Sequence, residues 1–84
     1  MQVGPQEINT VFAANEFCAN RLIGVFGSTP IVLSFDADIT PSMTVGHPLV
    51  ASSTTSLPPD QYGCGAVRAY APASTTITTS EFIR

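Results

Sequence analysis

Lysine is absent from this sequence, and so is tryptophan. Charged residues make up 11% of the chain, whereas ordinary globular domains carry about 25%. The only basic residues besides a single histidine are Arg21, Arg68 and Arg84, so most of the polar surface must consist of Ser, Thr, Asn and Gln. Because β-rich proteins use mixed charge, and edge lysines in particular, to prevent association, the composition indicates a chain that does not resist association.

The few charges sum to a formal net charge of −3 at pH 7, and no cluster of arginines occurs anywhere. Neutralisation of phosphates by basic side chains supplies most of the affinity of nucleic-acid-binding proteins. We therefore expect no direct contact with nucleic acid.

A basic segment followed by an apolar one, as in a secretory signal, is not visible at the start of the chain, where the first basic residue is Arg21. The longest uncharged apolar stretch covers residues 22–35, but the turn-forming residues 27–30 interrupt it and it is too short to cross hydrocarbon. We expect neither a signal peptide nor a membrane span.

Cysteine occurs twice, as Cys18 and Cys64, at a separation that matches no zinc-binding or redox motif. Two buried, reduced and dispensable thiols are our expectation, because the sequence indicates synthesis in the cytosol, where disulfides are rare. A disulfide between the two is the alternative.

With 84 residues, the chain has room for one domain of two packed layers. We expect residues 1–84 to form that single domain. A core of this size gives a narrow stability margin, so a partner outside the chain could contribute to stability.

Residues 31–40 show the clearest local pattern. Apolar side chains alternate there with mostly polar ones, which is typical of a half-buried strand. We expect Leu33 and Phe35 to be buried in the core, and Asp36 and Asp38 to point outward.

Two hairpins follow from the turn signals. Residues 20–26 are rich in large apolar side chains and precede the turn at 27–30, so we expect them to pair with 31–40 in a hairpin over residues 20–40. Residues 66–71 and the Thr-rich residues 75–83 flank Pro72, which predicts a C-terminal hairpin over residues 66–84.

Between the hairpins, residues 41–65 hold four of the seven prolines and a Ser/Thr run at 52–56. We expect this connection to be mostly loop, with a short strand at 47–51. Residues 1–19 are expected to form an extended arm or a strand. The fold class is therefore all-β: a small antiparallel β-sandwich or open barrel of five or six strands, with an extended N-terminal arm and proline-rich loops.

No set of residues carries a recognisable chemistry. Asp36 and Asp38 would lie on one face of a strand, where two carboxylates are too few for calcium and serve to solubilise the surface. His47 is the only histidine, and no nucleophile elbow accompanies it. The glycines Gly63 and Gly65 lack the strand, helix and lysine of a phosphate loop and indicate a tight bend.

The five phenylalanines are too scattered for a stacking platform for bases, so we interpret them as core residues. They are Phe12, Phe17, Phe26, Phe35 and Phe82. We assign no catalytic residue, no cofactor-binding residue and no metal ligand, and expect that the protein is not an enzyme and needs no cofactor.

In this combination of size, low charge, abundant Ser and Thr and proline-rich connections, the chain resembles the small decoration, or cement, proteins of tailed-phage capsids and other minor virion proteins. The Thr-rich segment at 66–83 is the part that comes nearest. The resemblance implies a virion protein, made in the host cytoplasm, that stabilises the shell by binding major capsid subunits and its own copies. It transfers no role to any single residue.

A second function class stays open, because a β-rich fold serves many functions. It is a small non-viral binding module that recognises a protein or a ligand through its loops. A gene beside a major capsid gene would favour the virion protein, and an isolated gene with an upstream export signal would favour the binding module.

Overall fold

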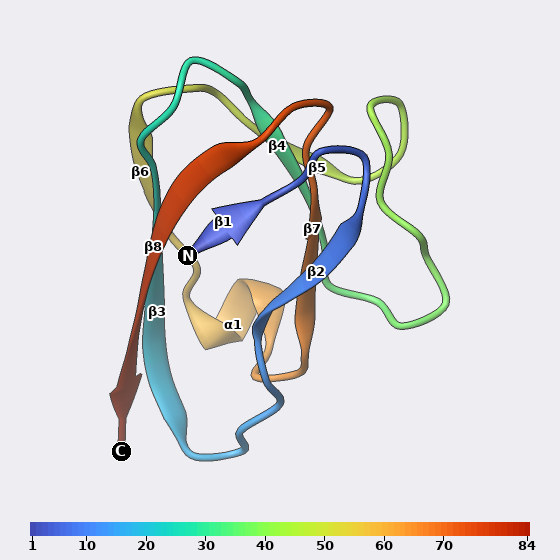
Figure 1. The fold of residues 1–84 in the computed structure, drawn as a ribbon. Coiled ribbons are helices and arrows are strands. Elements are labelled where there is room, and N and C mark those ends of the chain that lie inside the picture. Colours follow the sequence, from blue (N-terminus) through green and yellow to red (C-terminus); the bar gives the residue numbers. More distant parts are fainter.

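A computed structural model describes all residues 1–84 as an open β-sandwich made of two antiparallel four-stranded sheets (Figure 1). Sheet I has the strand order β1-β8-β3-β6, and sheet II the order β2-β7-β4-β5. No helix is long and apolar enough to cross a membrane. The elements in chain order are β1 (Gln2–Val3), β2 (Ile8–Phe12), β3 (Cys18–Val25), β4 (Ile31–Ser34), β5 (His47–Leu49), β6 (Ser53–Ser56), α1 (Pro59–Tyr62), β7 (Val67–Tyr70) and β8 (Thr75–Ile83).

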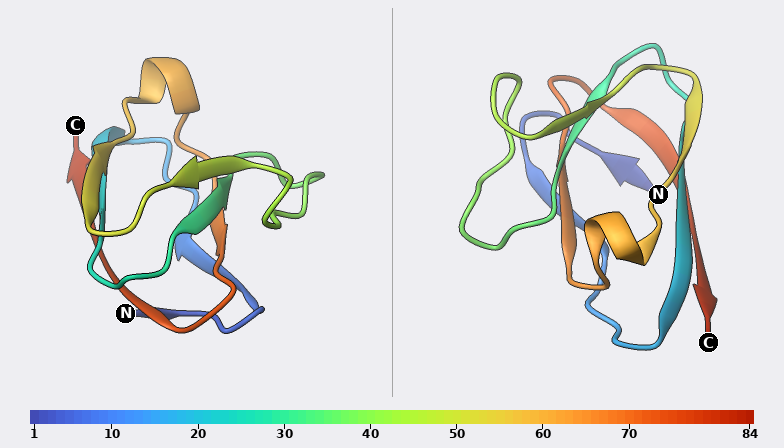
Figure 2. Two further views of the ribbon diagram at one scale, coloured as in Figure 1. Left: turned by 90° about the horizontal axis from the view of Figure 1, so that it is seen from above. Right: turned by 180° about the vertical axis from the view of Figure 1, so that it is seen from behind.

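The all-β, sandwich-like class expected from the sequence is confirmed, although the strands are more numerous than the five or six expected. The core lies between the sheets and contains residues from both, together with Leu57 from the segment before α1. Strand β1 and helix α1 lie on opposite sides of the sandwich (Figure 2). The buried cluster consists of Val3, Val11, Phe12, Ile23, Val25, Ile31, Leu33, Leu49, Leu57, Val67, Ala69, Ala71 and Ile77.

Neither predicted hairpin forms. Strand β3 belongs to sheet I, where it pairs with β8 and β6, whereas β4 belongs to sheet II, where it pairs with β7 and β5. Strands β7 and β8 are divided between the sheets in the same way. The turns at 27–30 and 72–74 therefore carry the chain from one sheet to the other. Turn residues predict that a chain reverses direction, but they do not determine whether it returns within the same layer.

Strand β4 ends at Ser34, so the predicted strand over 31–40 is wrong in its second half. The Ser34 hydroxyl lies 2.7 Å from the Ile39 carbonyl oxygen, and the Asp38 amide donates to the Asp36 carboxylate at 2.9 Å. These bonds turn the chain away from the sheet. Leu33 is buried as expected, and Phe35 is only partly buried against the core.

All four residues of β4 are buried, which the expected half-buried alternation does not allow. The loop over residues 35–46 is the reason, because it projects from the sandwich and returns along the outer side of sheet II (Figure 1). A Cβ atom on Gly46 would come within 2.6 Å of the Val32 side chain. The loop therefore covers part of the outer face of sheet II.

The connection at 41–65 contains more regular structure than expected. The short strand predicted at 47–51 is present as β5, but the Ser/Thr run forms edge strand β6 instead of a loop. Its inward-facing Ser and Thr side chains are only half-buried, which explains why the run lacks the apolar alternation by which strands are recognised.

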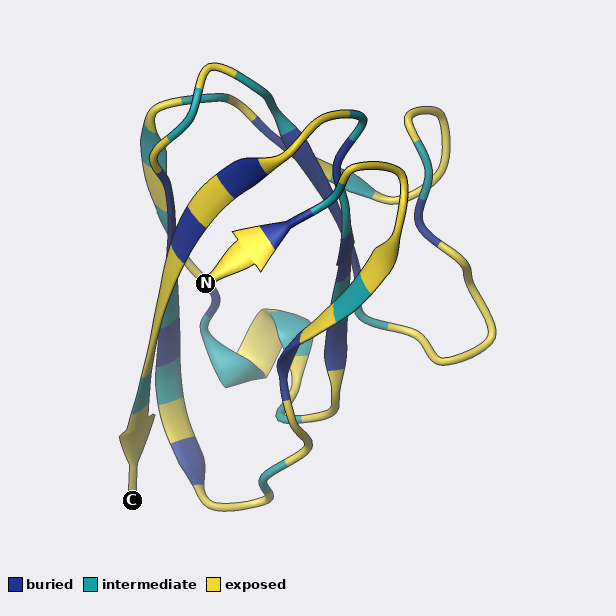
Figure 3. Ribbon diagram, viewed as in Figure 1, coloured by how far each residue is buried: buried dark blue, intermediate teal, exposed yellow.

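The N-terminal residues form two strands and are not a free arm. Strand β1 pairs with β8, and β2 pairs with β7. Val3, Val11 and Phe12 are buried in the core. Strands β1 and β2 each begin exposed and end buried (Figure 3). The strand alternative for this segment is therefore the correct one.

The expectation of two reduced thiols is wrong, because Cys18 and Cys64 form a disulfide. Their Cα atoms lie 5.9 Å apart, within the range that such a bond requires. Cys18 begins β3, and Cys64 lies in the bend between α1 and β7. The proximity results from tertiary packing across 46 residues, for which the sequence carries no local signal.

Candidate interaction surface

The outer face of sheet I is not covered by any loop of the chain. Ile23 and Val25 of β3 point into the core, so the alternating residues Leu22 and Gly24 point outward. Registered partners on β6 and β8 continue the same face. We call this surface the outer face, and it consists of Gln2, Asn20, Leu22, Gly24, Phe26, Thr54, Ser56, Thr76, Thr78, Ser80 and Phe82.

No residue of the outer face carries a charge. Hydroxyl side chains of β6 and β8 stand in rows on either side of β3, and the apolar side chains of Leu22, Phe26 and Phe82 lie among them. Phe26 is 64% exposed and Phe82 is 50% exposed. Large exposed aromatic groups in an uncharged surrounding are typical of protein interaction sites.

Gly24 explains how Phe26 is held. A Cβ atom on Gly24 would lie 3.3 Å from the Phe26 ring and 2.9 Å from the hydroxyl of Thr78. The ring therefore lies close over the glycine backbone, and Gly24 is buried beneath it although it faces outward. The aromatic side chain is thus pre-positioned on the sheet surface, which reduces the entropy that a partner would have to remove.

An ion pair between a buried arginine and a partly exposed glutamate stiffens the sheet behind this face. The side chain of Arg21 is 1% exposed, and its Nε donates to the Glu81 carboxylate at 2.7 Å. Its remaining nitrogens donate to the carbonyl oxygens of Ala13, Cys64 and Gly65 at 2.7 to 3.2 Å. The hydrogen bond from Arg21 lowers the pKa of Glu81, against the opposing effect of burial. A buried charge needs such complete pairing to be tolerated.

This network lies next to the disulfide. Arg21 bonds the carbonyl of Cys64, and its guanidinium carbon lies 4.9 Å from the centre of the Phe12 ring. Asn15 donates a second hydrogen bond to Glu81 at 3.2 Å. One charged side chain thus joins β3 and β8 to two loops, and we assign it a structural role. Sequence reasoning missed it, because nothing in the sequence distinguishes Arg21 from a surface arginine.

A second exposed apolar group lies on the loop over residues 35–46, on the opposite side of the molecule from the outer face (Figure 2). Ile39, Met43 and Val45 are each about half exposed. The middle of the loop is fixed, because Arg68 donates to the carbonyl oxygen of Ile39 at 2.6 Å and Pro41 is buried.

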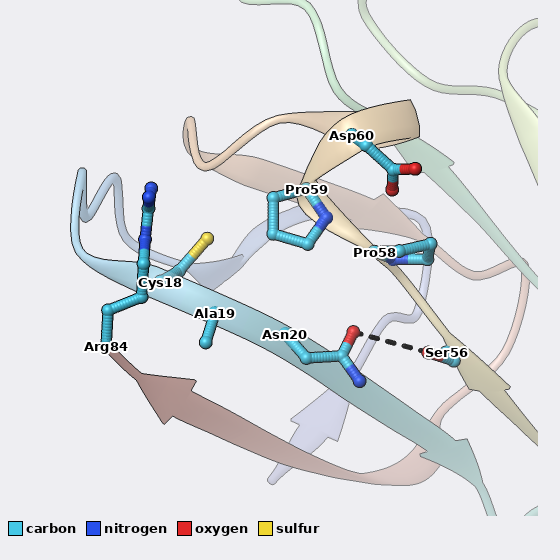
Figure 4. Close-up of a pocket in the computed structure, with 8 residues that line it drawn as sticks. All are labelled: Cys18, Ala19, Asn20, Ser56, Pro58, Pro59, Asp60 and Arg84. Atoms are coloured by element: carbon cyan, nitrogen blue, oxygen red, sulfur yellow. Dashed lines mark hydrogen bonds between the residues drawn. The ribbon is translucent and has the colours of Figure 1, made fainter.

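A shallow pocket of about 490 Å³ lies where the ladder between β3 and β6 ends (Figure 4). The last bond of that ladder runs from the Leu57 amide to the Arg21 carbonyl at 2.8 Å. Pro58 and Pro59 have no N–H group and cannot continue the pairing. Arg84 and Asp60 lie at opposite ends of the pocket (Figure 4). Its lining residues are Cys18, Ala19, Asn20, Ser56, Pro58, Pro59, Asp60 and Arg84.

The residues considered for catalysis lie apart from the outer face. Asp36 and Asp38 are exposed in the turn after β4, as expected for solubilising groups. His47 packs against the rings of Phe35 and Tyr62, with centroid distances of 5.9 Å and 5.7 Å, and these two rings also contact each other at 4.7 Å. No group of three or more His, Cys, Asp or Glu side chains is placed to hold a metal ion. The bend expected at Gly63 is present, with a positive φ of 72°.

The interpretation of all five phenylalanines as core residues is wrong for three of them. Phe12 is buried and Phe35 packs against the core, but Phe17, Phe26 and Phe82 are at least half exposed. Periodicity contained part of the signal, because Phe26 lies an even number of residues from Leu22 and an odd number from the buried Ile23. That spacing places Phe26 and Ile23 on opposite faces of the strand, but it does not show which face is buried.

Comparisons of the chain with protein-family models, with curated proteins and with solved structures find no match.

Proposed function

We propose that this protein is a non-catalytic structural component of a virion, which binds major capsid subunits through the outer face of sheet I and thereby stabilises the shell. The absence of charge from the outer face is the observation that carries this proposal. A surface of hydroxyl groups and aromatic rings loses less solvation energy than a charged surface when a protein covers it, because each buried charge would have to be paired.

The difference between the two sheets supports this choice of face. The loop over residues 35–46 covers part of the outer side of sheet II and buries Val32, but no comparable segment covers sheet I. The outer face also has a stiff backing in the disulfide and the pair of Arg21 and Glu81. A rigid, pre-formed face favours attachment to a repeating lattice, because little conformational entropy is lost on binding.

Co-sedimentation tests the proposal with shells assembled from the major capsid protein encoded in the same genome. We expect the wild-type chain to sediment with the shells and to raise their melting temperature, since a ligand that binds only the assembled state stabilises it. Thr78→Lys places a charge in the middle of the outer face and should abolish binding. Thr10→Lys is the matched control, because Thr10 is an exposed strand residue on the outer side of sheet II.

Three results would contradict the proposal: a genome without a capsid gene, a wild-type chain that does not sediment with the shells, or equal binding by Thr78→Lys. Before binding is compared, both variants should show the melting temperature of the wild type, because exposed substitutions usually change stability by less than about 0.5 kcal/mol.

A second candidate function, a binding module that recognises its partner through a loop, is favoured by the exposed Ile39, Met43 and Val45. These side chains sit on a loop whose middle is anchored by Arg68. If they carry the binding, replacing all three with Ser should abolish it, while Thr78→Lys should leave it unchanged.

A further inference from the structure

Strand β8 has one edge that is open over most of its length. Strand β3 pairs with β8 from Ile77 to Ile83, but on the other side β1 pairs only with Thr75 and Thr76 (Figure 1). Beyond β1, the free edge continues to the end of the strand.

The hydrogen bonds that are present show which backbone groups point toward this edge. Ile77 exchanges two bonds of 2.9 Å with Met1, on the β1 side. Thr76 accepts a bond of 2.8 Å from the Phe26 amide, on the β3 side. Because successive residues of a strand direct their N–H and C=O groups to opposite edges, Thr79, Glu81 and Ile83 direct theirs away from β3, where no strand lies.

The other sheet edges carry features that hinder pairing. Strand β1 has only two residues, and β5 contains Pro48, which has no N–H group to donate. Strand β2 has a register shift between Thr10 and Phe12, and β6 is short and is followed closely by Pro58. The open part of β8 contains no proline and no lysine, and its one charge, Glu81, is paired with Arg21. The register shift beyond Phe82 lies on β3, between Cys18 and Asn20. The open part of β8 therefore lacks most of the usual protection of an edge strand.

We propose that the open edge of β8 pairs antiparallel with the same edge of a second copy of this chain, about a two-fold axis at Phe82. In this register Phe82 faces its own counterpart in a pair without direct backbone bonds, where side chains approach closely. Glu81 lies opposite Ile83 of the second copy, and the two residues exchange both backbone bonds. A register centred on Glu81 would instead place two carboxylates side by side.

The pairing joins two copies of sheet I into one continuous sheet, in which β6, β3 and β8 are followed by the same strands in reverse order. The outer faces of the two copies then form one surface with an aromatic pair at its centre, and Arg84 lies beside this pair, opposite Ser80 of the second copy. The inference extends the proposed function by supplying a partner for the same sheet, but the pairing needs no shell and can be measured on the purified chain alone.

Sedimentation velocity over a wide concentration range tests the pairing with two variants at one position. Ile83→Pro removes an N–H that points away from β3, so the ladder with β3 keeps its bonds. We expect it to raise the dimer Kd at least about tenfold, because the symmetric dimer loses this bond twice. Ile83→Ala keeps the N–H and should change the Kd by less than about threefold.

Cysteine cross-linking then tests the register. Under mild oxidation, Phe82→Cys should give a covalent dimer, because facing residues at such a pair have Cα atoms about 4.5 Å apart. Ser80→Cys lies on the same face but away from the axis, and should cross-link far more slowly.

The proposal is overturned if the wild type is monomeric even at about 1 mM, if Ile83→Pro dimerises as strongly as Ile83→Ala, or if the two cysteine variants cross-link equally. Thr78→Lys separates this result from the proposed function, since it should abolish shell binding while the dimer persists. Failure of either interaction therefore leaves the other one measurable.

Discussion

Removal of the bond between Cys18 and Cys64 should strongly destabilise this protein. The bond closes a loop across 46 residues, and the chain-entropy model gives about 4 kcal/mol for a loop of that length. A domain of this size has a total unfolding free energy of about 5 to 10 kcal/mol. Loss of the bond should therefore remove a large part of the stability.

The double variant Cys18→Ala with Cys64→Ala makes this change without leaving reactive thiols. For a domain of 60 to 100 residues, 1 kcal/mol corresponds to about 4 to 8 °C in melting temperature, so we expect a decrease of roughly 15 to 30 °C. Circular dichroism melts of the wild type, the wild type with reductant, and the double variant would measure it. The double variant serves as the control, since reductant should not affect it.

A decrease of less than about 5 °C would refute the reasoning, because it corresponds to only about 1 kcal/mol. Mass spectrometry after alkylation of the unreduced protein must be done first, to establish whether free thiols are present. If the wild type carries the bond and still tolerates its loss, then the unfolded chain is already compact around these residues, and the entropy assigned to loop closure is too large.

Two further predictions concern single side chains. The folded-state pKa of Glu81 is lowered, so the stability from its pairing with Arg21 should be complete above the ordinary Glu pKa of about 4.3 and lost as the pH falls through the lower folded value. Glu81→Gln should weaken this acid dependence of the unfolding free energy in urea titrations. An unchanged pH profile would contradict the prediction. Leu33→Ala should lower the unfolding free energy by about 2 to 5 kcal/mol, and Phe35→Ala by about 2 kcal/mol, because Phe35 is partly exposed. The reverse order of the two losses in chemical denaturation would show that Phe35 belongs to the core.

The all-β class could be predicted from the sequence, because alternation and turn residues are local properties. Leu33 lies in the core as predicted, and the short strand predicted at 47–51 within the proline-rich connection is present as β5. The pairing of strands could not be predicted in the same way. The turn at 27–30 looks the same whether the following strand returns beside β3 or crosses to the other sheet.

The candidate site was largely invisible in the sequence for a related reason. Whether Phe26 and Phe82 are core or surface residues depends on which face of their strands is covered, and this is decided by the layer opposite. The role of Arg21 depends on Glu81, 60 residues away, and on carbonyl groups from two loops, one of which is 44 residues away. Composition nevertheless indicated an uncharged surface, and the outer face agrees with that indication.

The strand order of sheet I has a consequence for the order in which the chain can fold during synthesis. Strand β8 lies between β1 and β3, so β1 has no partner, and β3 is paired only with β6, until β8 has been synthesised. The ladders of sheet II need no residue beyond Tyr70 and can form first, whereas sheet I is completed last, through distant pairings of the kind that fold slowly. Until then one edge of β3 is exposed to other chains, and a chaperone or dilution should improve the yield.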